Sequence, residues 1–273
     1  MRNAVVILML FFFSSQAFAQ DDYYQLDDVK DTSRFFIGFN IGGHFPNKNT
    51  AIIYTGRPSV TQFGIPWIFD NPFNQQAFND HFQYPFRITE YPQEPTYRSE
   101  LELGVHAGYE ISKKLSVFVE VNAIQMSYEQ FFTITIDDPN NQSPGDVFRQ
   151  IPIIGEENRF HFNLGGQFNY FQNETQAAYV SFFGNMNNVS MRRNYIIINS
   201  IEYPIIHIDE NRPDLRPGGI GFGFGAGLGF RFVLTDHILM DPYYQFYRTQ
   251  INMSEAIQPI GMHHSLGIRI LWN

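Results

Sequence analysis

Residues 219–232 read Gly-Ile-Gly-Phe-Gly-Phe-Gly-Ala-Gly-Leu-Gly-Phe-Arg-Phe, so every second side chain is apolar. Successive side chains of a β-strand point to opposite faces, and the segment therefore predicts a strand with one continuous apolar face. It is long enough to cross a bilayer, because a tilted membrane strand needs about 9–11 residues. Its glycines all share one parity, which excludes the G-x-G-x-x-G spacing of a dinucleotide-binding loop.

The N-terminus has the pattern of a secretory signal peptide. Arg2 precedes an apolar run over residues 4–13, and Ala17 and Ala19 frame a cleavage site. The run is too short for an uncleaved membrane helix, which needs about 20 residues. We expect export, cleavage near Ala19, and three parts: a signal peptide over residues 1–19, a periplasmic segment over 20–33 and a barrel over 34–273. No Cys follows the apolar run, so a lipid anchor on cysteine is excluded.

Composition narrows the class of membrane protein. The chain has 18 Lys+Arg and 27 Asp+Glu, and removing the signal with its single Arg leaves 17 against 27, a net charge of −10. This acidity argues against nucleic acid as a partner. Aromatic residues reach 17% while the mean hydropathy is only −0.24. A barrel reconciles the two values, because lipid-facing and lumen-facing side chains alternate along each strand.

Eight segments alternate in this way and predict an all-β fold, an antiparallel up-and-down transmembrane β-barrel. They cover residues 34–43, 99–111, 115–130, 159–171, 177–187, 219–233, 237–250 and 262–272. The connections between them measure about 55, 3, 28, 5, 31, 3 and 11 residues in turn. Outer-membrane barrels have short periplasmic turns and long extracellular loops, so this alternation also predicts the orientation.

The last ten residues, His-Ser-Leu-Gly-Ile-Arg-Ile-Leu-Trp-Asn, alternate outward apolar residues up to the penultimate Trp272. This ending is similar to that of barrels assembled into outer membranes. Residues 34–273 resemble the small eight-stranded barrels of the OmpA and OmpX type and the generic outer-membrane β-barrel family. The resemblance implies a cell outer-membrane location with membrane lipid around the wall, and it brings no catalytic motif.

Two features depart from a regular eight-stranded meander. Pro242 lies inside the seventh segment, where it cannot donate to a ladder, so we expect a bulge or a register shift there. Residues 194–199 and 203–208 are both rich in β-forming residues. They could form a hairpin above the membrane or two more wall strands of a ten-stranded barrel; we favour the hairpin, because neither run is long enough to span.

The polar faces of the segments define a candidate lumen network. The interior of an eight-stranded barrel is just wide enough for side chains to fill, which favours a hydrogen-bonded plug over an open pore. In a pore, five inward acids against three arginines would give weak cation preference. Aromatic residues of neighbouring strands, Tyr179, Phe183, Tyr243 and Tyr247, are expected to cover the glycine face of residues 219–232. The candidate lumen residues are Arg34, Glu100, Glu102, His106, Glu110, Glu120, His161, Arg231, Asp241 and Arg269.

Catalytic and metal sites have little support. His263 and Ser265 share one face of the last segment and resemble the His-x-Ser pair of outer-membrane lipid A deacylases, but the Glu that this family uses further along the chain is missing. His106 and His161 lie on separate segments with no metal-binding spacing. We therefore expect a protein without enzymatic activity, cofactor or metal, with a lipid-modifying enzyme as a remaining alternative.

The first long connection is unusually aromatic for a loop. Disordered loops are poor in aromatic residues, so it is expected to pack into a cap over the barrel mouth or to present a binding surface. A membrane or extracellular protein, or a glycan, would be the partner of such a surface. Function as a structural or interaction subunit is the first hypothesis and a narrow solute pore the second. The candidate contact residues are Trp67, Phe69, Phe73, Tyr84, Phe86 and Tyr91.

Overall fold

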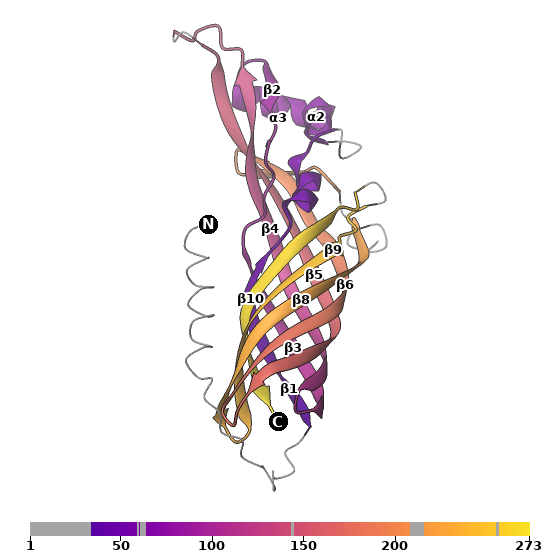
Figure 1. Ribbon diagram of the computed structural model, residues 1–273. Coiled ribbons are helices and arrows are strands. Elements are labelled where there is room, and N and C mark those ends of the chain that lie inside the picture. The colour runs from indigo at the N-terminus through magenta and orange to yellow at the C-terminus, as the bar shows by residue number, and fades with distance from the viewer. Residues whose placement is uncertain (1–33, 59, 61–63, 143–144, 208–215, 255–256) are drawn as a thin grey trace, which may run out of the picture. The chain divides into compact units, whose positions relative to one another are not determined.

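A computed structural model describes residues 34–58, 60, 64–142, 145–207, 216–254 and 257–273. The predicted signal peptide and periplasmic segment lie outside the described residues. Eight antiparallel strands close into a ring, because each pairs with the next along the chain and the last pairs with the first (Figure 1). This confirms the predicted barrel and its eight strands. The ring consists of β1 (Phe35–Phe45), β3 (Glu100–Ser112), β4 (Leu115–Ile136), β5 (Val147–Gln172), β6 (Gln176–Ile198), β8 (Gly218–Thr235), β9 (Ile238–Gln250) and β10 (Ile260–Trp272).

The wall is apolar outside and polar inside. Along β1, Ile37 and Phe39 are 52% and 62% exposed, whereas Asn40 and His44 on the opposite face of the strand are buried. On β8 the apolar ridge is exposed in the same way, with Phe224 at 70%. A water-soluble sheet has the opposite arrangement, with its apolar face on the core. The alternation read from the sequence is thus the inside–outside alternation of a barrel whose exterior suits lipid.

The two ends of the barrel differ as predicted. The connections β3–β4, β5–β6 and β8–β9 are tight turns at one end, and the longer connections all lie at the other, which we call the mouth (Figure 1). The 28-residue connection expected after the third strand is wrong, because β4 and β5 stay paired without a break from Leu115↔Phe168 to Ile136↔Val147. Residues 131–136 are aromatic or β-branched, and such residues extend a ladder beyond the length that a membrane requires.

Two short strands lie outside the ring. β7 (Ile201–Pro204) folds back on the end of β6, with Ile198 paired to Ile201. Asn199 and Ser200 between them both have positive φ, 51° and 64°, as a two-residue hairpin turn of the primed type requires. The predicted hairpin is therefore confirmed, and the alternative of a ten-stranded wall is wrong. β2 (Phe86–Glu90) similarly pairs with the upper part of β4, and with no other strand among the described residues.

The prediction of a bulge or register shift at Pro242 is wrong. Pro242 pairs with Ile268 in a continuous register between β9 and β10. Between β8 and β9 the register is also the same before and after it, from Gly229↔Tyr243 to Phe232↔Met240. The proline removes one donor from the ladder, and the pairs around it hold the strand in place without a bulge.

The first long connection folds into helices. It contains the 3-10 helix η1 (Lys48–Thr55) and the α-helices α2 (Gly64–Asp70) and α3 (Pro72–Phe82). Asn71 caps α3 by accepting a hydrogen bond from Phe73 N at 3.0 Å, and Pro72 occupies its first turn. An Asn-Pro pair favours this kind of helix start. Among the described residues, no helix combines the length and apolar character needed to cross a membrane.

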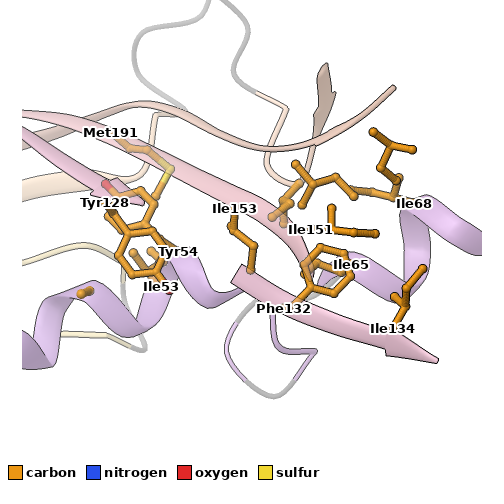
Figure 2. Close-up of a cluster of buried hydrophobic side chains, with 14 of the residues drawn as sticks. Ile53, Tyr54, Ile65, Ile68, Tyr128, Phe132, Ile134, Ile151, Ile153 and Met191 are labelled. Carbon is orange, nitrogen blue, oxygen red and sulfur yellow. The ribbon is translucent and has the colours of Figure 1, made fainter. Parts of the chain in front are cut away.

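Above the ring, the helices and the long ends of β4, β5 and β6 share a second hydrophobic core. Figure 2 shows Ile65 and Ile68 of α2 against Phe132 and Ile134 of β4, with Ile153 of β5 beside them. Each of these side chains is at most 2% exposed. We call this assembly of η1, α2, α3, β2, β7 and the strand ends around them the cap. The predicted packing of the aromatic connection is thus observed.

Candidate functional site

The glycine face of β8 leaves room that larger side chains fill. A Cβ at Gly225 would lie 2.5 Å from Tyr247 Cβ and 2.6 Å from the Phe183 ring, and one at Gly229 would lie 2.1 Å from the Tyr179 hydroxyl. Three of the four expected aromatic residues therefore cover this face. The fourth, Tyr243, instead approaches Gly267 of β10.

A first ionic cluster occupies the turn end of the lumen. Arg231 on β8 lies 3.4 Å from Asp241 on β9 and 3.9 Å from Glu110 on β3. Its guanidinium also lies over the ring of Phe36, 5.0 Å from the centroid. The charges thus have partners on three strands, which reduces the cost of burying them.

A second cluster fills the centre. Arg269 on β10 donates two hydrogen bonds to Glu120 on β4, from Nε at 2.9 Å and from Nη2 at 2.6 Å. His106 Nδ1 lies 3.0 Å from the same carboxylate, and the amides of Asn163 and Gln245 each donate to its other oxygen at 3.2 Å. Five strands therefore converge on one buried carboxylate and hold the walls together.

Tyr179 connects these two clusters. Its hydroxyl donates to Asp241 at 2.6 Å and accepts from Arg269 Nη1 at 2.9 Å. Tyr243 packs against the other side of the Arg269 guanidinium, 3.7 Å from the ring centroid. The turn end and the centre of the lumen thus form one network.

Histidines occupy the next level toward the mouth. Ser265 Oγ donates to Glu102 at 2.6 Å and lies 3.3 Å from His44 Nδ1. The His44 ring lies 5.6 Å from that of His161 and 5.7 Å from that of His263, centroid to centroid. All five side chains are buried.

The first long connection, which we call the first loop, seals the mouth through a third ionic cluster. Arg159 Nε donates to Glu157 at 2.5 Å, and both are fully buried on β5. Tyr54 of η1 donates to the same carboxylate at 2.6 Å, Tyr97 donates to it at 3.2 Å, and Arg159 Nη2 donates to Thr50 at 3.0 Å. Burial and then the neighbouring Glu157 charge raise the pKa of both tyrosines above the usual range. The first loop is therefore bonded to the inside of the barrel.

The candidate lumen residues fall into two groups. Arg34 does not join the network: it is exposed at the turn end, and its backbone carbonyl accepts from Glu110 N at 2.7 Å. Glu100 is half-buried near the mouth and accepts from Ser127 N at 3.0 Å. The remaining eight take part in lumen contacts: Glu102, His106, Glu110, Glu120, His161, Arg231, Asp241 and Arg269.

Sequence reasoning missed the mouth cluster. Glu157 and Arg159 have the same parity as His161, so continuing the inward face of that strand backwards by two and four residues would have found them. The expected strand began at residue 159, which left Glu157 outside it, and Arg159 at its first position was not counted among the inward residues. Thr50 and Tyr54 come from a connection that carries no strand alternation, and nothing in its pattern places it in the lumen.

The Ser265 environment lacks the geometry of a catalytic triad. Ser265 lies with His44 and Glu102 rather than with His263, whose Nδ1 instead accepts from Asn47 N at 3.4 Å. Both Ser265 and Glu102 approach the same His44 nitrogen, at 3.3 and 3.4 Å. A triad needs the two on opposite ring nitrogens, with the serine open to substrate, and here all three are at most 1% exposed.

His106 and His161, the histidines considered as metal ligands, have separate partners. His106 pairs with Glu120, whereas His161 Nδ1 lies 3.2 Å from Asn185 Nδ2 at another level of the lumen. Within the part of the chain that the structure describes, no three His, Cys, Asp or Glu side chains are arranged to hold a metal ion.

The candidate aromatic residues of the cap divide by exposure. Phe69, Tyr84, Phe86 and Tyr91 are half-buried and pack against the cap core. Two others point outward from the helices: Phe73 is 93% exposed on α3 and Trp67 is 42% exposed on α2. The cap thus packs most of its aromatic residues against its own core. Phe73 stays at its surface, and Trp67 is partly exposed while its ring contacts that of His207 edge to face, 6.0 Å between centroids.

A groove of about 470 Å³ lies between α2, α3 and β2. Phe69, Phe78 and Phe86 form its apolar side, and their rings meet edge to face, at 5.1 Å for Phe69–Phe78 and 4.9 Å for Phe69–Phe86. The polar side chains around it are Asp70, Gln75, Asn79 and Arg87.

Comparisons with known proteins identify similar folds only. No family model and no curated protein matches the sequence. Neisserial surface protein A (NspA) aligns at 9% identity with a TM-score of 0.44, over 88% of this chain and 97% of that one. OprG, an outer membrane protein from Pseudomonas aeruginosa, aligns at 10% and 0.40, over 87% and 92%. Ail of Yersinia pestis, in complex with the heparin analogue sucrose octasulfate, aligns at 9% and 0.35, over 87% and 99%. Such low identities and scores carry no function to this chain.

Proposed function

We propose that the protein is an integral outer-membrane β-barrel that does not conduct and that binds a partner at the cell surface through its cap. The observation that carries the proposal is the bonding of the first loop to the lumen through Tyr54 and Thr50. The same connection that closes the mouth also builds the helices α2 and α3 above it.

The location is supported by the wall and by the N-terminal sequence. A closed ring satisfies backbone groups in lipid, and the exposed side chains of β1 and β8 form an apolar exterior. The signal-like run over residues 4–13 supports export. Short turns at one end and the cap at the other support an orientation with the cap outside the cell.

The lumen argues against the alternative of a solute pore. Side chains cross the lumen at two levels, where Arg231 reaches Glu110 at the turn end and Arg269 reaches Glu120 in the centre. At the mouth, Glu157 and Arg159 of β5 bond Tyr54 and Thr50 of η1. A conducting eight-stranded barrel would need these groups to separate, which would leave buried charges without partners.

Recognition is supported by the aromatic side chains that the cap leaves exposed at its surface, Phe73 and Trp67. A phenylalanine that is 93% exposed on a capped helix contributes nothing to the core beneath it. Aromatic side chains are typical anchors of binding interfaces, where they supply a large area at low entropic cost.

The test is capture from outer-membrane and extracellular fractions with the purified protein in nanodiscs. The double variant Phe73→Ala/Trp67→Ala should weaken binding of the captured partner by about 30-fold, since interface anchors contribute about 2 kcal/mol or more. Phe148→Ala is the matched control, because Phe148 is 59% exposed on β5 and lies outside the helices. Equal capture by wild type and the double variant, or capture by neither, would refute the proposal.

A further inference from the structure

We infer that the groove between α2, α3 and β2 is a binding site for a neutral saccharide. This inference rests on the proposed function, because it names the class of partner that the cap recognises. Its volume of about 470 Å³ falls within the range of about 300–1,000 Å³ that small-molecule sites occupy.

The apolar side of the groove suits the C–H face of a sugar ring. Phe69 and Phe86 are half-buried, so part of each ring remains open to the groove, and Phe78 lies beneath them with 1% exposure. The three rings hold one another edge to face, which fixes their orientation. An aromatic face carries partial negative charge and attracts C–H groups.

The polar side suits hydroxyl groups. Gln75 and Asn79 lie one turn apart on α3, so their amides face the same groove. Each amide offers both donors and an acceptor, which matches a hydroxyl that donates and accepts. Within the described part of the chain, neither amide nor the Asp70 carboxylate makes a side-chain hydrogen bond, so all three are available to a ligand.

Charge selects a neutral sugar over a sulfated or otherwise anionic one. Arg87 is the only basic residue among those lining the groove, and it already pairs with Asp137 at 2.7 Å and Asp146 at 3.5 Å. The Asp70 carboxylate would repel an anionic ligand. A strongly acidic chain, with 27 Asp+Glu against 18 Lys+Arg, adds to this effect.

A peptide fits the groove less well. Strand addition requires an extended free edge, but β2 has only five residues and its register shifts between Ile88 and Glu90. Such a short, irregular edge is the kind that proteins use to prevent pairing with another chain.

The experiment is binding of the full barrel in nanodiscs to an array of neutral oligosaccharides, with heparin-derived oligosaccharides as the anionic arm. Wild type should bind at least one neutral oligosaccharide and no heparin oligosaccharide. Gln75→Ala/Asn79→Ala should weaken that binding by about tenfold or more, since each amide loses a hydrogen bond to the sugar. The matched control is Gln76→Ala, because Gln76 is exposed on the same helix but does not line the groove.

Loss in the double variant with retention in Gln76→Ala supports the inference. Equal sugar binding by all variants places the site elsewhere and overturns it, as does binding of heparin oligosaccharides alone. Competition by unstructured peptides but by no sugar overturns it in favour of a peptide site. If no sugar binds while capture still depends on Phe73 and Trp67, the saccharide site is refuted and the proposed function survives.

Discussion

Adding a single methyl group at Gly229 should break the network inside the barrel. The Cβ of Gly229→Ala would lie 2.1 Å from the Tyr179 hydroxyl, so that hydroxyl must retreat by about 1.3 Å to reach an ordinary contact of 3.4 Å. The hydroxyl bonds Asp241 at 2.6 Å and Arg269 at 2.9 Å, and such a shift removes at least one of these bonds.

The expected cost follows from two effects. Overpacking costs about 1–3 kcal/mol, and losing a hydrogen bond to a charged group costs about 1.5–3 kcal/mol. We therefore expect Gly229→Ala to lower the free energy of unfolding by about 3–5 kcal/mol. Gly184→Ala is the matched control on the neighbouring strand β6: its Cβ meets nothing closer than Leu164 O at 4.0 Å, on the lipid-facing side. It should change stability by less than about 0.5 kcal/mol.

Urea unfolding of the protein in lipid vesicles measures both values, with tryptophan fluorescence and gel mobility of unheated samples as independent readouts. The reasoning is refuted if Gly229→Ala unfolds at the same urea concentration as wild type. It is equally refuted if the two alanine variants lose the same amount, because the cost would then come from glycine's backbone rather than from the Tyr179 contact.

Three further predictions concern the lumen and the cap. Arg269→Met should destabilise the barrel by about 3–5 kcal/mol in the same urea assay, because it leaves Glu120 buried without its cation; an unchanged midpoint would contradict this. Asn71→Ala removes the α3 cap at a cost of about 1 kcal/mol, so limited proteolysis should cut the cap faster while the barrel fragment stays intact; unchanged cleavage would refute it. Tyr54 and Tyr97 should remain un-ionised well above pH 10 when absorbance of tyrosinate is followed at 295 nm, because burial and Glu157 raise the pKa of both. Tyr54 and Tyr97 therefore stabilise the fold fully below the pKa of an unfolded tyrosine, and this stabilisation is lost as the pH rises from there through their raised pKa in the folded protein. Titration of every tyrosine near pH 10 in the folded protein would contradict this.

Strand alternation made the barrel predictable from the sequence. Parity alone placed Glu120 and Arg269 inside the lumen and Phe224 outside, because each strand has one face in lipid and one in the interior. Parity predicts the face of a side chain only inside a strand, and it failed just outside one. Arg34 precedes the first strand at the turn end, so its side chain reaches solvent although its parity points inward.

The cap was less predictable because its order comes from tertiary contacts. Residues 131–136 continue β4 beyond the membrane length, where their β-forming side chains also pack against α2 and β5. The Asn71–Pro72 pair favours a helix start, but our sequence reading predicted no helix in this connection, and no local pattern showed that η1 would bond Glu157 inside the barrel. Such non-local contacts leave no periodicity to read.

Single-channel recording in planar lipid bilayers tests most directly whether the barrel is closed. Purified wild-type protein should insert without producing conductance steps, because ionic contacts cross the lumen at the turn end and in the centre and η1 is bonded to its mouth. Steady channels in wild type, with a conductance or cation preference that changes in Glu120→Gln, would contradict the closed lumen and establish the solute pore instead.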